Sequence, residues 1–257
     1  MSGATLLATV QVGQHVVVYP FGLAVNLDTV ISTLVAVAVV LGVGLWLRSR
    51  VTDGVPGKLQ TAIEAVWSTI DDYVAEMIGP FARWVVPLVT TLFFFILVCN
   101  WLELIPTGDR LTSPTADTNL TFALAVLVIA LVHVTAIRQR GWRRYLKTNY
   151  LHPAGLPKVA YILLTPINII TQVSYPVSLS LRLFGNMFAA AIMLQIIALL
   201  PIYIFWTLNG VWKLFEGLFV DVIQAFIFSL LTIIYLSMAT AEEGEEEDHP
   251  AAEAAAA

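Results

Sequence analysis

Long apolar runs dominate the sequence, and each is long enough to cross a lipid bilayer. Residues 29–47 and 84–102 contain no charged residue, and residues 118–137 contain His133 as their one titratable side chain. A bilayer core of about 30 Å needs about 20 apolar residues in a helix. Backbone groups in lipid must be hydrogen-bonded within their own segment, so we predict helices rather than strands for these runs.

The apolar region 159–241 is longer still and contains four fixed charges: Arg182, Lys213, Glu216 and Asp221. The stretch 159–200 would reach about 60 Å as one helix, so we expect it to be steeply tilted or broken near Pro166 or Pro176. The last span is expected over 214–241, with 222–241 as its apolar part. The pattern predicts an all-α, polytopic membrane protein with five transmembrane helices in a single domain.

A sixth helix is expected at 58–79, where apolar residues recur with a 3.6-residue period and acidic residues fill the other side. This pattern is typical of a helix that lies in the membrane interface. Its polar face contains Glu64, Asp71, Asp72 and Glu76. Acidic groups do not attract anionic lipid, so a protein partner on this face is a second interpretation.

The basic residues of the short connections indicate the orientation, because they collect on the cytoplasmic side. One face has Arg48, Arg50, Lys58, Arg83, Arg138, Arg140, Arg143, Arg144, Lys147 and Lys158, whereas the opposite face has Arg110 and Lys213. We therefore predict an outside N-terminus and a cytoplasmic C-terminus. The acidic segment 242–257 is expected to be a disordered cytoplasmic tail.

Composition excludes an ordinary soluble protein, since 58% of the 257 residues are hydrophobic and 12% are charged. The sequence has no phosphate-binding glycine loop, no paired cysteines and no zinc-binding helix motif. The four histidines are too scattered to suggest a metal site. We expect no cofactor. Topology accounts for the basic loop 138–158, so we expect no binding of nucleic acid.

Ionisable groups inside apolar spans are functional candidates, because a charge at the centre of a bilayer costs about 2.5–3.5 kcal/mol on insertion scales. Arg182 is the main one, since no other charged residue lies between Lys158 and Lys213. It could form an internal salt bridge with Glu216 or Asp221, or it could meet a carboxylate on another chain. The small residues Ser178, Gly185, Ala189 and Ala190 near it would let another helix approach closely.

Other polar residues in the spans have two interpretations each. If Glu216, Asp221 and Glu103 are buried, they could carry protons, whereas at the headgroups they would be ordinary end charges. His133 could be an interhelical hydrogen-bonding residue or a proton relay. The remaining candidates, which can hydrogen-bond near these groups, are Asn100, Asn168, Ser178, Asn186 and Gln224.

Three motifs resemble the subunit a family of rotary F-type ATP synthases. They are SLSLRLFGNMFA at 178–189, QAFIFSLLTIIYLS at 224–237 and NWLELIP at 100–106. The resemblance covers essentially the whole chain, and the first motif is long and specific. It implies a proton-conducting stator in a bacterial cell membrane, with partners in a ring of c subunits, subunit b of the peripheral stalk and the lipid bilayer. The helical hairpin 159–241 would face the ring.

In that family two offset half-channels meet the ring at mid-membrane. Arg182 matches the arginine that faces the ring carboxylates, and Asn186 and Gln224 match polar residues near it. Three positions depart from some members, which have an ionisable group where this chain has Ala191 and Gly217 and an acid where it has Asn168. The resemblance therefore implies that proton uptake has moved to Glu216, Asp221 or both.

Two other functions are compatible with an intramembrane arginine. A secondary transporter or channel could use Arg182 to bind an anion, but it would be expected to show internal repeats, and none is evident. A scaffold subunit that conducts no ions gives no reason to place Arg182 at such depth. Neither interpretation requires a catalytic centre in this chain.

Overall fold

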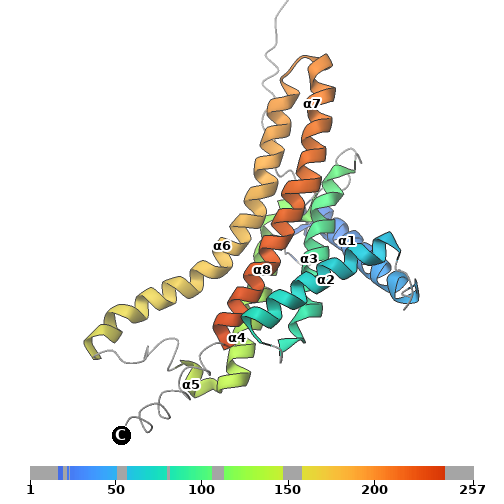
Figure 1. The fold of residues 1–257 in the computed structure, drawn as a ribbon. Helices are drawn as coiled ribbons and strands as arrows, with labels where there is room; N and C mark the ends of the chain where they lie inside the picture. Colours follow the sequence, from blue (N-terminus) through green and yellow to red (C-terminus); the bar gives the residue numbers. More distant parts are fainter. Residues whose placement is uncertain are drawn as a thin grey trace, which may run out of the picture. The chain divides into compact units, whose positions relative to one another are not determined.

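The computed structural model describes residues 17–19, 22, 24–50, 57–79, 82–105, 113–146 and 158–240 (Figure 1). Within these ranges the chain is almost entirely helical, which confirms the predicted all-α class. The predicted tail 242–257 and Pro106 of the third motif lie outside the described residues. Five helices are long and apolar enough to cross a membrane: Leu27–Ser49, Val85–Leu104, Thr118–Gln139, Pro166–Ala198 and Ile202–Thr240.

The elements follow one another with short connections. A two-stranded antiparallel pair, β1 (Val17–Val18) and β2 (Val25–Asn26), precedes the helices. The helices are α1 (Leu27–Arg50), α2 (Lys58–Met77), α3 (Val85–Trp101), α4 (Thr118–Arg140), α5 (Trp142–Leu146), α6 (Lys158–Ala198), α7 (Ile202–Phe215) and α8 (Asp221–Thr240). Short 3₁₀ turns, η3 (Leu102–Leu104) and η4 (Pro114–Ala116), follow α3 and precede α4, and a π-turn, η6 (Glu216–Val220), joins α7 to α8.

Two compact units divide the chain, and several helices contribute to both. The first unit comprises Met1–Ser49, Phe94–Thr121 and Leu181–Phe226; the second comprises Arg50–Phe93, Phe122–Ser180 and Ile227–Ala257. In the first unit Ala36 of α1 packs against Cys99 and Leu102. In the second, Ala136 of α4, Tyr145 of α5 and Ala239 of α8 form a buried cluster.

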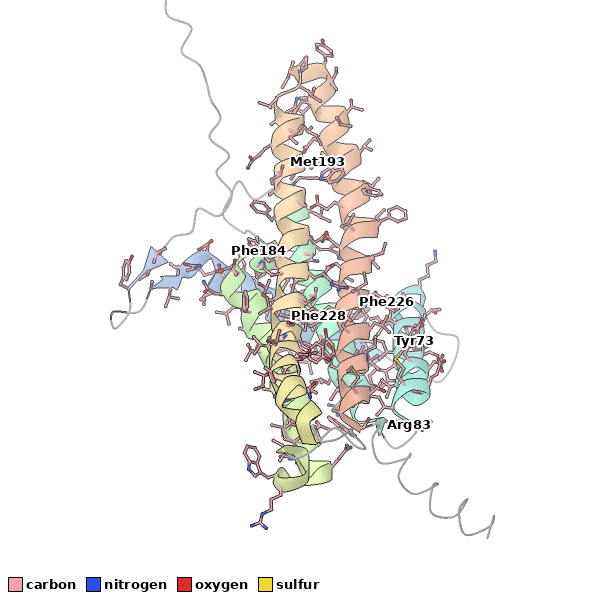
Figure 2. The ribbon with its side chains drawn as sticks, turned by 90° about the vertical axis from the view of Figure 1, so that its left-hand side faces the viewer. Tyr73, Arg83, Phe184, Met193, Phe226 and Phe228 are labelled. Carbon is pink, nitrogen blue, oxygen red and sulfur yellow. The ribbon has the colours of Figure 1, made fainter. Side chains whose placement is uncertain are left out.

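The long helix α6 contains both Pro166 and Pro176 without interruption. Of the two expectations for this stretch, the structure therefore excludes a break at either proline. After the turn at 199–201, α7 begins at Ile202, earlier than the start at 214 that the sequence suggested. The apolar segment from Tyr203 to Val211 continues directly into the final span, and Pro201 at the N-cap ends the preceding turn. In both views α7 lies beside the C-terminal part of α6, where Figure 2 labels Phe184 and Met193.

The amphipathic helix is present as α2, and its burial pattern follows the predicted stripe in part, since Leu59 and Trp67 are exposed and Gln60 is buried. Ile70 and Val74 are buried, whereas Glu64, Asp72 and Glu76 are exposed. The hydroxyl of Ser237 in α8 donates a hydrogen bond to the carbonyl of Met77 at 2.6 Å. Gly79 ends the helix with φ of +106°, a conformation that favours glycine, and its N–H bonds back to Val74.

Candidate functional site

Arg182 lies in the part of α6 that belongs to the first unit, and its side chain is exposed. It makes no hydrogen bond or ion pair with any residue that the structure describes. The alternative of an internal salt bridge to Glu216 or Asp221 is therefore absent from this structure.

Small residues flank Arg182 along one face of α6. Ser178, Arg182, Gly185 and Ala189 follow the four- and three-residue spacing of a helical stripe, and a Cβ added at Gly185 would meet no atom within 4 Å. Ser178 and Ala189 are exposed, whereas Ala190 is 4% exposed and packs inward. The arginine thus stands on an open surface where another helix can come close.

Glu216 and Asp221 lie at the two ends of the π-turn, and both are buried, with 3% and 1% of their surface exposed. The sequence left open whether they were buried or faced the headgroups. One oxygen of Glu216 and both oxygens of Asp221 are buried and have no hydrogen-bond partner among the residues that the structure describes. Buried carboxyl groups without partners are costly when charged, so this pair is suited to holding and releasing protons.

Asn186 and Gln224 extend this set of buried polar atoms. The amide nitrogens of both side chains are buried, as are Gln195 Oε1 of α6 and Trp212 Nε1 of α7, and none of these atoms has a hydrogen-bond partner in the described part of the chain. All four residues belong to the first unit, together with Glu216 and Asp221. The sequence analysis did not single out Gln195 or Trp212, although a glutamine inside an apolar span was a usable signal.

Asn100 and Glu103 belong to the same unit, at the end of α3. The hydroxyl of Thr115 donates to Asn100 Oδ1 at 2.6 Å, and Ser113 Oγ lies 2.7 Å from Thr115 Oγ1. Glu103 is partly buried, and its backbone carbonyl accepts a hydrogen bond from Lys213 Nζ at 3.2 Å. Residues at the end of α3 are thereby joined to α7 within the first unit.

Asp117 is a buried carboxylate that the sequence analysis missed. It is 4% exposed, and its Oδ2 accepts hydrogen bonds from Asn26 Nδ2 at 2.6 Å and Thr29 Oγ1 at 2.7 Å. Its Oδ1 accepts the backbone N–H of Asn119 at 2.8 Å, which caps the first turn of α4. An aspartate directly before an apolar run was the available signal for this cap.

The remaining candidates, His133, Asn168 and Ser178, belong to the second unit. His133 Nδ1 lies 3.1 Å from the hydroxyl of Tyr145, the contact expected of a histidine that hydrogen-bonds between helices. Asn168 is partly buried and Ser178 is exposed. The described residues contain no group of three or more histidine, cysteine or acidic side chains that could hold a metal ion.

The fold and these side chains define an all-helical, multi-pass membrane protein with ionisable groups inside its spans, an arrangement that marks ion and proton pathways. The family model described as ATP synthase A chain matches residues 30–237. The chain is 43% identical over 260 residues to ATP synthase subunit a of Mycobacterium tuberculosis, covering 97% of this chain and all of that protein.

Two further relatives are also named ATP synthase subunit a. ATP synthase subunit a of Acidothermus cellulolyticus is 40% identical over 242 residues, which cover 93% of this chain and 86% of that protein. The protein of that name from Mycobacterium leprae is 42% identical over 251 residues, covering 93% and 95%. The chain belongs to the ATP synthase subunit a family and is a component of the proton-translocating membrane sector.

Proposed function

We propose that this chain provides the proton path of the membrane sector and that Arg182 is the fixed charge facing the carboxylates of a ring of c subunits. The observation that carries the proposal is an exposed arginine within an apolar helix that has no acidic partner among the described residues. A charge at that depth needs a partner, and the small residues along its face leave room for one on another chain.

The interaction energies are compatible with an ion pair that forms and breaks between Arg182 and a ring carboxylate as the ring rotates. Two unit charges 4 Å apart gain about 4 kcal/mol at an effective dielectric of 20. This gain lets a ring carboxyl release its proton beside Arg182, although the same carboxyl must be neutral where it faces lipid. Moving one charge across 100 mV yields about 2.3 kcal/mol, which is comparable, so rotation can separate the pair. The arginine retains its own proton and so blocks a direct leak.

The buried groups of the first unit supply the rest of the path in this proposal. Glu216 and Asp221 take up protons on the outer side, and Gln224 and Asn186 hydrogen-bond close to the arginine. Asn100, Glu103, His133, Asn168 and Ser178 are candidate polar residues of the two half-channels. The ion moved is H⁺, and the chain uses no cofactor.

We also propose the partners of the chain and its orientation in the membrane. The hairpin of α6 and α7–α8 faces the c-subunit ring, and subunit b of the peripheral stalk contacts another part of the protein. The chain lies in the bacterial cell membrane with its N-terminus outside and its C-terminus in the cytoplasm. The bias of basic residues toward one set of connections supports this orientation.

The test is proton flux and ATP synthesis in vesicles that contain the complete ATP synthase with Arg182→Ala. We expect no proton-driven synthesis and no ATP-driven pumping, but normal insertion, because removing a charge from an apolar span removes an insertion cost of a few kcal/mol. Passive proton leak should persist or rise. Arg182→Lys is the matched variant, and it should recover little coupling because a lysine can release its proton.

Two double variants separate this proposal from an internal salt bridge. Arg182→Ala is combined with Glu216→Gln or with Asp221→Asn. If the arginine only neutralised one of these acids, the matching double variant would recover synthesis. Recovery in either double variant, or near-normal coupled synthesis with Arg182→Ala alone, would contradict the proposal.

A further inference from the structure

A π-turn, Glu216–Val220, joins α7 to α8 where an α-helical turn would be expected. The backbone N–H of Asp221 donates to the carbonyl of Glu216, five residues back. Single π-turns inside helices are rare and occur frequently at functional sites. Here the turn begins and ends at the two buried acids.

The π-turn determines which way these acids point. In a regular α-helix, residues five apart are about 140° apart around the axis. In this structure Glu216 and Asp221 are both buried, while Leu218 and Phe219 between them are 55% and 57% exposed. The extra residue of the turn therefore places both carboxyl groups on the buried face, and Gln224 follows on that face.

Three contacts from the end of α3 hold the π-turn. The indole N–H of Trp101 donates to the carbonyl of Gly217 at 2.8 Å. In a regular α-helix that carbonyl would accept the N–H of residue 221, but in the π-turn this N–H bonds to Glu216. Trp101 thus provides a donor to a carbonyl that has lost its α-helical one, which matters because unpaired carbonyls are costly in a membrane.

The other two contacts hold η3, the turn that follows α3, close to the π-turn. A Cβ at residue 217 would collide with the side chain of Leu104, so glycine permits this close packing. Lys213 Nζ donates to the carbonyl of Glu103 at 3.2 Å, one turn before the π-turn. Both contacts and the Trp101 bond lie within the first unit.

We propose that Trp101 is a positioning residue for proton transfer. Its indole N–H stabilises the π-turn through the carbonyl of Gly217, and the π-turn keeps Glu216 and Asp221 on one buried face. The inference rests on the proposed function, in which these two acids take up protons. The ordinary alternative for Trp101, whose side chain is 40% exposed, is an aromatic anchor at the membrane interface.

The first test is Trp101→Phe in the complete ATP synthase. This change retains an aromatic ring and removes the N–H. We expect normal assembly, a roughly two- to tenfold lower rate of ATP synthesis, which corresponds to the loss of one ordinary hydrogen bond, and a shifted dependence of that rate on the outer pH. Trp84→Phe is the matched control, because Trp84 is 50% exposed and its indole N–H donates no hydrogen bond among the described residues.

The second test removes the π-turn itself. Deleting Leu218 takes out the extra residue, so a regular α-helix would still place the two acids four residues apart on one face. Trp101→Phe should then have no further effect, because its target carbonyl is bonded within the helix. The pH profile of Trp101→Phe alone decides the question if the deletion variant does not assemble.

Several outcomes would overturn the inference. These are a wild-type rate and pH profile with Trp101→Phe, an equal loss with Trp84→Phe, or an undiminished effect of Trp101→Phe in the deletion background. Failure of the proposed function is a separate result, since it appears as coupled synthesis with Arg182→Ala or as full synthesis with Glu216→Gln combined with Asp221→Asn. The two readouts use different residues and therefore cannot be confused.

Discussion

At the scale of single residues, the first unit combines two kinds of unusual side chain. Arg182 is exposed and has no partner among the described residues, although arginine is rare inside apolar spans. Glu216 and Asp221 are buried with carboxyl oxygens that have no hydrogen-bond partner. An arginine without an acidic partner and two buried acids with unbonded carboxyl oxygens are costly in one unit, unless another chain or bound protons compensate them.

We predict that Glu216→Gln combined with Asp221→Asn slows proton-driven ATP synthesis about tenfold or more. Both changes preserve side-chain shape and remove the capacity to hold a proton, and positioned proton-transfer groups contribute about 10²–10⁴-fold to rates. The measurement is synthesis by reconstituted vesicles at a fixed proton gradient. Glu64→Gln on α2 is the control, because the amide oxygen that this change introduces can still accept the hydrogen bond from Gln60. Full synthesis by the double variant would place proton uptake elsewhere.

At the scale of elements, α2 differs from every other long helix, since its charged residues lie along one face. Asp71 is 4.0 Å from Arg83 as an ion pair, with both side chains substantially exposed; such pairs contribute little to stability. Asp72 and Glu76 are exposed, one helical turn apart. This acidic face is open for a protein partner, and the peripheral stalk is the partner that we expect.

We predict that Asp72→Lys with Glu76→Lys lowers the amount of peripheral stalk that remains with the purified complex. The reversed charges would repel basic groups that the acidic face attracts, whereas the buried side of α2 is unchanged. Stalk content relative to this chain is the quantity to measure. Asp72→Asn with Glu76→Gln should give a smaller loss. If the reversed variant retains wild-type stalk content, α2 is only an interfacial anchor.

At the scale of the whole molecule, five apolar helices connected by polar segments define a multi-pass membrane protein. Five spans, the number found among the described residues, would put the two ends of the chain on opposite sides of the membrane, and we propose this arrangement. The basic residues of the connections indicate which end is in the cytoplasm, because positively charged loops tend to remain there. The end of α4 should therefore be cytoplasmic and the turn between α6 and α7 external.

We predict opposite labelling of two introduced cysteines in a Cys99→Ala background. Gln139→Cys, at the exposed end of α4, should react with a membrane-impermeant thiol reagent only from the cytoplasmic side. Tyr203→Cys, exposed near the start of α7, should react only from outside. Cys99 is replaced so that it cannot react with the reagent, and alanine retains its Cβ and removes only the sulfur. Labelling with the two sides exchanged would reverse the topology.

The sequence by itself determined the class of this protein. Apolar runs and backbone hydrogen bonding are properties of contiguous residues, so the apolar spans among the described residues could be predicted directly, although α5 and the early start of α7 were not. The depth of Arg182 in an apolar region was likewise evident without a structure, and the motif around it was sufficient to identify the family.

Only the tertiary structure decided how distant segments meet. The bond from Trp101 to Gly217, the close approach of Leu104 to Gly217, and the partners of Asp117 join residues far apart in sequence. The π-turn has no local signature, because five residues of α-helix and of π-helix can have the same sequence. In the structure Trp101 and Leu104 contact the turn at Gly217, and Glu216 and Asp221 are both buried.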